Sequence, residues 1–175
     1  MIRLRVQSLG LDQATKSPVV ILQESEGERV LPIWIGAAEA SAIAMELAGM
    51  KFSRPLTHDL FPSIITGLGA RLTRVLISRV QDNTYFAELV LERGGEVFTV
   101  DARPSDSIAI ALRTRAELFA DEDLLEGSII DSTPQGGDAP ADDDPLAPPV
   151  PGLPPEQLKE YLRKLNPEDL GRFQP

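Results

Sequence analysis

The chain has 175 residues, a formal net charge of -10 and no cysteine. This length suits one domain with a sizeable core plus an appendage, and the lack of cysteine excludes disulfides, thiolate metal sites and cysteine nucleophiles. Residues 1–130 hold 13 Lys+Arg against 18 Asp+Glu, and residues 131–175 hold 4 against 9, so each part carries -5. Such an acidic chain argues against a broad nucleic-acid surface but leaves room for a local basic cleft.

The first residues place charges inside the first apolar run, so no signal peptide is expected there. No apolar run approaches the roughly 18 residues that indicate a membrane span. We therefore expect a cytoplasmic protein that does not interact with a membrane.

Alternating apolar and polar residues predict a half-buried strand over residues 2–7. Apolar runs at 19–22 and 30–35 flank a polar turn and predict a β-hairpin. Pro32 cannot donate a hydrogen bond to a neighbouring strand, so the second strand of this hairpin is expected at a sheet edge or at a bulge.

Two helices are expected next. Residues 37–48 are rich in alanine, the best helix former. A second helix is predicted over residues 57–68, with Thr57 as its capping residue and with His58 and Asp59 in its first turn.

Three β segments follow at 72–80, 85–91 and 97–101, separated by two-residue turn signals that join antiparallel strands. They predict a meander whose last strand brings Asp101 to the start of the next helix. A short segment at 118–119 then closes the domain.

The stretch over residues 100–113 passes directly from a strand into a helix. Its apolar block at 108–112 leaves no polar stripe, so this helix is expected to be central and buried. Ser105 is predicted to cap the helix, and Asp106 to interact favourably with the helix dipole.

These elements predict an α+β domain over residues 1–130, in which three main helices pack on a mostly antiparallel or mixed sheet. Residues 131–155 are rich in Pro, Asp, Gly and Ala, which predicts a disordered acidic linker. Residues 156–175 carry leucines at helical spacing, which predicts a short amphipathic helix and tail. This helix is expected to dock on the domain or to bind a protein partner.

Charged side chains gather at the two later helix starts, where we expect a site. His58, the only histidine of the chain, is the candidate general base, and Asp59 and Asp106 complete the candidate catalytic set. Arg54 and Arg103 are the candidates for binding a phosphate. The structural alternative is that these acids and bases pair with one another and only stabilise the helix ends.

A divalent cation such as Mg²⁺ is a further expectation, because hard cations prefer oxygen ligands. The candidate ligands are Glu39, Asp59, Asp101 and Asp106. Their spacing matches no metal motif, and each acid at a helix start has the alternative role of complementing the helix dipole. The P-loop, dinucleotide-binding and nucleophile-elbow motifs are absent from the sequence, which argues against nucleotide-dependent phosphoryl transfer and serine hydrolysis.

Three blocks of the sequence resemble the signature blocks of the bifunctional nuclease (BFN) domain family: L-P-I-W-I-G-A-A-E-A at 31–40, R-P-L-T-H-D-L at 54–60 and D-A-R-P-S-D-S-I-A-I-A at 101–111. The blocks stand in the family order. The resemblance implies an α+β domain, commonly a homodimer, with nuclease activity on DNA and RNA. Ser107 stands where the family often has alanine.

We therefore expect a nuclease that hydrolyses phosphodiester bonds of DNA and RNA, with a metal ion assisting, and that forms a homodimer. The alternative is a non-catalytic regulatory module, in which the acidic linker and the C-terminal helix recruit a protein partner. A third hypothesis is a small anionic ligand at the two helix starts.

Overall fold

The computed structural model describes residues 1–12, 15–82 and 84–126, so the predicted linker and C-terminal helix lie outside the described residues. The predicted strands and the three main helices are confirmed, with boundaries that differ by a few residues. In chain order the elements are β1 (Ile2–Leu11), β2 (Pro18–Glu24), β3 (Val30–Trp34), α1 (Ala37–Leu47), α2 (Thr57–Gly67), β4 (Arg71–Gln81), β5 (Thr84–Arg93), β6 (Glu96–Ala102), α3 (Pro104–Thr114), β7 (Glu117–Ala120) and α4 (Asp123–Glu126).

The strands form one mixed sheet in the order β3-β2-β1-β7-β4-β5-β6. The predicted hairpin and meander are confirmed as antiparallel pairs, and β3 with Pro32 lies at a sheet edge. Strand β7 pairs antiparallel with β1 and parallel with β4, so it joins the two antiparallel halves. The segment at 118–119, predicted only to close the domain, therefore belongs to the central strand of the sheet.

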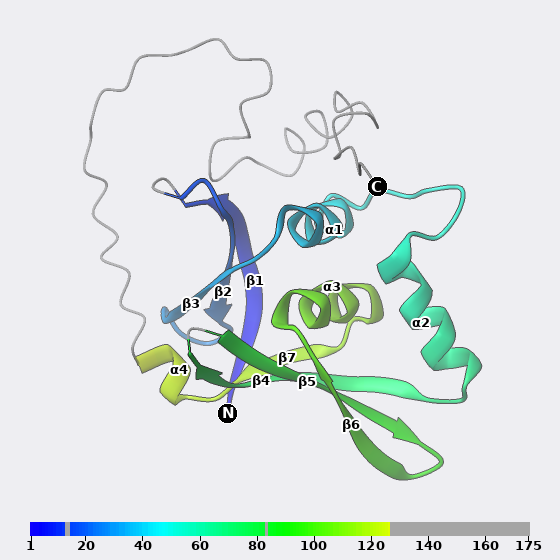
Figure 1. The fold of residues 1–175 in the computed structure, drawn as a ribbon. Helices are drawn as coiled ribbons and strands as arrows, with labels where there is room; N and C mark the ends of the chain where they lie inside the picture. Colours follow the sequence, from blue (N-terminus) through cyan, green and yellow to red (C-terminus); the bar gives the residue numbers. More distant parts are fainter. Residues whose placement is uncertain (13–14, 83, 127–175) are drawn as a thin grey trace.

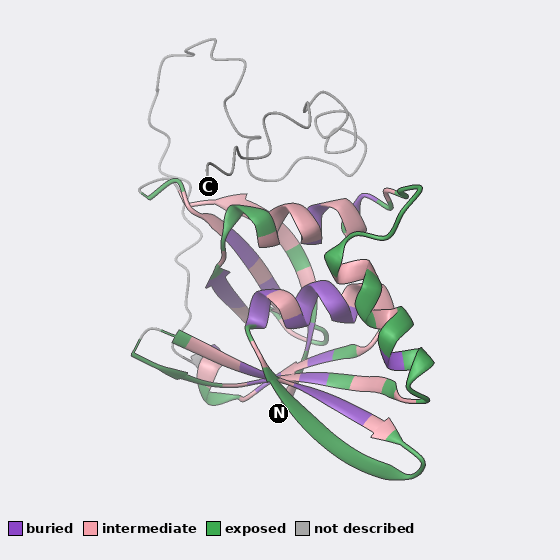
Figure 2. Cartoon of the chain, turned by 45° about the vertical axis from the view of Figure 1, so that its right-hand side comes forward, coloured by how far each residue is buried: buried purple, intermediate pink, exposed green. Residues whose placement is uncertain are grey.

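Helix α3 lies in the curve of the twisted sheet, between α1 and α2 (Figure 1), and packs on β4 and β5. Most of its length is buried (Figure 2), and Ile108 and Ala109 have no exposed surface. Each fully buried isoleucine contributes about 1.5–3 kcal/mol through removal of apolar surface from water. The prediction of a central buried helix is confirmed, and this helix fixes where the charged residues of its first turn lie.

The start of α3 differs from the prediction. Arg103 is the capping residue and Pro104 is the first helical residue, so Ser105 lies inside the helix and does not cap it. Proline suits this first position because its ring presets the helical φ and its missing N–H would have no helical partner. Arg103 therefore has an extended backbone, with φ -68° and ψ 145°.

The start of α2 also differs from the prediction by one residue. Leu56 is the capping residue and Thr57 is already helical. The side chain of Asp59 provides the cap, because its Oδ2 accepts a hydrogen bond of 2.9 Å from the Leu56 N–H.

The helices within the described ranges reach 11 residues, which is too short to cross a membrane.

Candidate functional site

The starts of α2 and α3 meet at a cleft with a volume of about 630 Å³. Its walls come from α1, the first turn of α2, strand β5 and the junction between β6 and α3. The charged or titratable side chains that line it are Glu39, His58, Asp101, Arg103, Asp106 and Arg113. The expectation that two distant helix starts bring their charged residues together is confirmed for His58 with Asp101, Arg103 and Asp106, but not for Arg54.

His58 and Asp106 join α2 to α3 in the lining of this cleft. The His58 Nε2 lies 3.0 Å from the Asp106 Oδ1, although the two residues are 48 positions apart. An ionised carboxylate only accepts hydrogen bonds, so Nε2 carries a hydrogen, and in the neutral form of the ring Nδ1 keeps its lone pair. The arrangement is a base oriented by a carboxylate.

Arg103 links this pair to α1. Its Nε donates to the Asp106 Oδ2 at 2.7 Å, and its Nη2 lies 2.9 Å from the Glu39 Oε1. The Arg103 side chain keeps 67% of its surface exposed, so its charge faces solvent at the cleft. Gly36, just before α1, leaves room for Glu39, because a Cβ at this position would overlap the Glu39 carboxylate.

The hydrogen bonds from Arg103 and His58 keep the carboxyl of Asp106 ionised. Partial burial by itself would raise the pKa of this carboxyl, but the hydrogen bonds from Arg103 and His58 outweigh burial and hold the pKa below its ordinary value. In return, the Asp106 carboxylate raises the pKa of Arg103. At neutral pH the cleft therefore contains an ionised carboxylate fixed between a guanidinium and an imidazole.

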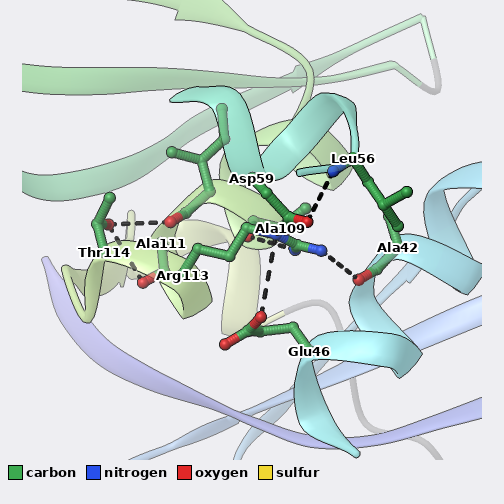
Figure 3. Close-up of polar contacts among 9 residues, drawn as sticks. Ala42, Glu46, Leu56, Asp59, Ala109, Ala111, Arg113 and Thr114 are labelled. Carbon is green, nitrogen blue, oxygen red and sulfur yellow. Dashed lines mark hydrogen bonds and ion pairs between the residues drawn. The ribbon is translucent and has the colours of Figure 1, made fainter. Parts of the chain in front are cut away.

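Arg113 is a residue whose role the sequence did not reveal. Its side chain is only 5% exposed, and its Nε donates to the Asp59 Oδ1 at 2.6 Å (Figure 3). Its other nitrogens donate to the carbonyl oxygens of Ala109 and Ala42, at 2.9 and 3.1 Å. One guanidinium thus ties α1 and α2 to α3. Arg113 stands seven residues after Asp106 and so on the same helix face, which was the available signal.

Asp59 lies behind the cleft rather than in its lining. One of its carboxylate oxygens accepts from Arg113 and the other from the Leu56 N–H. Burial opposes ionisation of this carboxyl, but these two hydrogen bonds hold its pKa below the ordinary value. The geometry therefore makes Asp59 an anchor for the start of α2.

The remaining candidates have different surroundings. Asp101 is exposed at the end of β6 and lines the cleft, whereas Arg54 is exposed in the connection between α1 and α2 and does not line it. In the described part of the chain, no group of three or more histidine or acidic side chains is arranged to hold a metal ion. Of the acids that were predicted to share a cation, Glu39 and Asp106 pair with Arg103, and Asp59 pairs with Arg113.

A comparison with protein families identifies the family of this chain. Residues 20–133 match the model of the bifunctional nuclease domain. The chain belongs to the bifunctional nuclease domain family. The resemblance of the three sequence blocks is thereby confirmed, and two of these blocks supply the linked residues of the cleft, His58 with Asp106.

Relatives of this BFN-family chain come from bacteria and plants. An uncharacterized protein of Mycobacterium tuberculosis is 37% identical over 95% of this chain and 96% of its own length. Bifunctional nuclease 2 of Oryza sativa subsp. japonica is 27% identical over 64% of this chain, and bifunctional nuclease 1 of Arabidopsis thaliana is 25% identical over 72%. The matched regions make up 36% and 41% of these two plant proteins.

Proposed function

We propose that this BFN-family protein hydrolyses phosphodiester bonds of DNA and RNA in the cleft, with His58 as the general base. The observation that carries the proposal is the His58–Asp106 hydrogen bond of 3.0 Å beside the exposed guanidinium of Arg103. A base oriented by a carboxylate and a cation for a phosphate oxygen are two parts that such a hydrolysis uses. The names of the plant relatives point to the same activity.

The proposed reaction uses a water molecule as the nucleophile. The Nδ1 of His58 accepts a proton from this water, and the water oxygen bonds to phosphorus while the bond to the leaving sugar oxygen breaks. Solvent protonates the leaving oxygen, and the ionised Asp106 stabilises the imidazolium. Because water attacks in place of a ribose 2′-hydroxyl, the same chemistry suits both DNA and RNA.

A divalent cation, with Mg²⁺ as the first candidate, remains part of this proposal. Three acids and two arginines line the cleft, so it has no excess of positive charge for a phosphate. Mg²⁺ in phosphoryl-transfer sites commonly uses one or two carboxylates together with oxygens of the substrate phosphate. Such binding needs no preformed cluster, and the exposed Asp101 is the best placed carboxylate for it.

The proposal also includes a homodimer. Strand β6 lies at the sheet edge and exposes Val97, Phe98 and Val100 to 64%, 42% and 44%. An open edge strand with apolar side chains is suited to pairing with another chain. Sedimentation of the wild-type protein should therefore give a dimer, and Val97→Lys should shift it towards the monomer.

A non-catalytic role is the second candidate. It is favoured by the pairing of Asp59, Asp106 and Glu39 with arginines, since such pairs also join helices without any chemistry. In this case the predicted acidic linker and the predicted C-terminal helix would recruit a protein partner. The two candidates differ in whether the purified protein degrades nucleic acid.

The decisive experiment compares four purified proteins: wild type, His58→Ala, Asp106→Asn and the control Glu92→Gln. Glu92 pairs with the exposed Arg71 on the sheet, away from the cleft. Degradation of labelled single-stranded DNA and RNA is followed with Mg²⁺ and with EDTA. We expect the cleft variants to lose about 100-fold in rate, the size of a general-base contribution, and the control to match wild type. Equal rates in all four proteins would remove the assignment of His58 and Asp106, as expected if a contaminating nuclease is the source, and no degradation by wild type would favour the non-catalytic role.

A further inference from the structure

A second hollow, with a volume of about 400 Å³, lies beside the cleft. Glu39 and Arg103 line both spaces, so their ion pair forms part of the wall between them. The other walls of the second hollow come from the end of β3, the start of β5 and the start of α3. A ligand that contacts Arg103 from the cleft is therefore next to this hollow.

Trp34, the only tryptophan of the chain, lines the second hollow. It is the last residue of β3, and 52% of its surface is exposed, whereas the preceding Ile33 is 3% exposed. About half of this large aromatic residue therefore lies outside the hydrophobic core. Tyr85, at the start of β5, adds a second aromatic ring to the same hollow.

Charge alone gives this hollow little affinity for an anion. Its charged lining residues are Glu39 and Arg103, which carry opposite charges and pair with each other. The whole chain carries -10 and repels a polyanion. Stacking of an aromatic side chain on a nucleobase does not depend on net charge, and every base offers a flat face for it.

We propose that Trp34 is a base-stacking platform and that the second hollow receives an unpaired base of single-stranded nucleic acid. The phosphate next to that base then lies near Arg103, and the strand continues into the cleft. In a duplex the faces of the bases are already stacked on each other, so this subsite selects single strands. The inference rests on the proposed function, because it names the form of the substrate that the same cleft takes.

The single tryptophan provides a readout that does not depend on catalysis. Stacking of a base on Trp34 should quench the intrinsic fluorescence of the protein. The probes are a single-stranded oligothymidylate, an abasic oligonucleotide of the same length and a duplex. We expect saturable quenching by the single strand and little change with the abasic strand or the duplex.

Variants separate stacking from general effects on the surface. Trp34→Ala should weaken binding of the single strand about tenfold, measured by anisotropy of a labelled oligonucleotide, and Trp34→Phe should retain part of the affinity. The matched control is Phe52→Ala, because Phe52 is also an exposed aromatic residue, at 45%, and lines neither space. Circular dichroism of each variant checks that it is folded.

Two results would overturn the inference. One is unchanged fluorescence with the single strand together with equal affinities of wild type and Trp34→Ala. The other is a fluorescence that depends on protein concentration without nucleic acid, which would show that a second copy covers Trp34. Quenching by the single strand without any degradation would keep the stacking subsite and reject the nuclease. Degradation without quenching would keep the nuclease and reject the stacking subsite.

Discussion

The Nε of Arg113 lies 2.6 Å from the Oδ1 of Asp59, so an almost fully buried cation at the end of α3 holds the start of α2. The neighbouring residue, His58, contacts Asp106 on the same helix α3. Two polar links therefore join the same pair of helices, one buried behind the cleft and one lining it. The buried link between Arg113 and Asp59 holds α2 in the position where the ring of His58 reaches the carboxylate of Asp106.

Asp59→Asn should lower the free energy of unfolding by about 2–3 kcal/mol, because it leaves the charge of Arg113 buried without its closest acid. Glu46→Gln is the matched control, since Glu46 lies 4.0 Å from the same guanidinium and should cost under about 1 kcal/mol. Urea unfolding of both variants measures the difference. Equal losses would show that Asp59 is not the main partner.

Stability should fall in acid because of Asp59 and Asp106. Both carboxyls have a folded-state pKa below the ordinary 3.8, so the unfolded chain takes up these protons first as the pH falls. Their contribution is complete above about pH 5 and is lost as the pH falls below 3.8 towards the folded-state values. Urea unfolding between pH 7 and pH 3 should show this decline. The Asp59→Asn and Asp106→Asn double variant should show a shallower one, and an equal slope in both proteins would contradict the assignment.

Ser107→Ala should stabilise the protein by up to about 1 kcal/mol. The Ser107 side chain is fully buried in α3, and its hydroxyl has no hydrogen-bond partner among the described residues. Removing an unpaired buried hydroxyl recovers its desolvation cost. The neighbouring Ile108→Ala should instead cost about 2–5 kcal/mol through the cavity it leaves. Thermal unfolding compares the two variants, and a loss of stability in Ser107→Ala would indicate a partner for this hydroxyl.

Gly36→Ala should disturb the cleft more than the fold. The backbone at Gly36 is extended, with φ -75°, so alanine fits it, but the new Cβ displaces the Glu39 carboxylate from Arg103. We expect a stability change within about 1 kcal/mol and, if the proposed function holds, a several-fold loss of phosphodiesterase activity.

Gly67→Ala is the control for this glycine substitution. A Cβ at Gly67 meets no atom within 4 Å, and the residue ends α2. Alanine should therefore raise the free energy of unfolding by about 0.5–1 kcal/mol without changing activity. Unchanged activity in both glycine variants would show that the Glu39–Arg103 pair does not matter for the reaction.

Local sequence patterns predicted most of the fold. Three of these patterns depend only on neighbours in the chain and could be predicted without a structure. They are the alternation in β1, the turn signals between β4, β5 and β6, and the apolar block of α3. The helix caps were misplaced because Ser105 and Thr57 are good capping residues in general. Here Arg103 is the capping residue of α3 because Pro104 takes the first helical position, and the Asp59 side chain accepts the hydrogen bond at the start of α2. The four residues of β7 were too few to show that this strand lies at the centre of the sheet.

By itself the sequence determined the α+β class, the family and the two helix starts that carry the charged residues. Only the tertiary structure decided which charges meet: His58 with Asp106, Arg103 with Glu39 and Arg113 with Asp59. The physical reason is that periodicity and capping act over a few residues, whereas ion pairing depends on distances between side chains far apart in the chain. The packing of α1 and α2 on the buried α3 sets those distances.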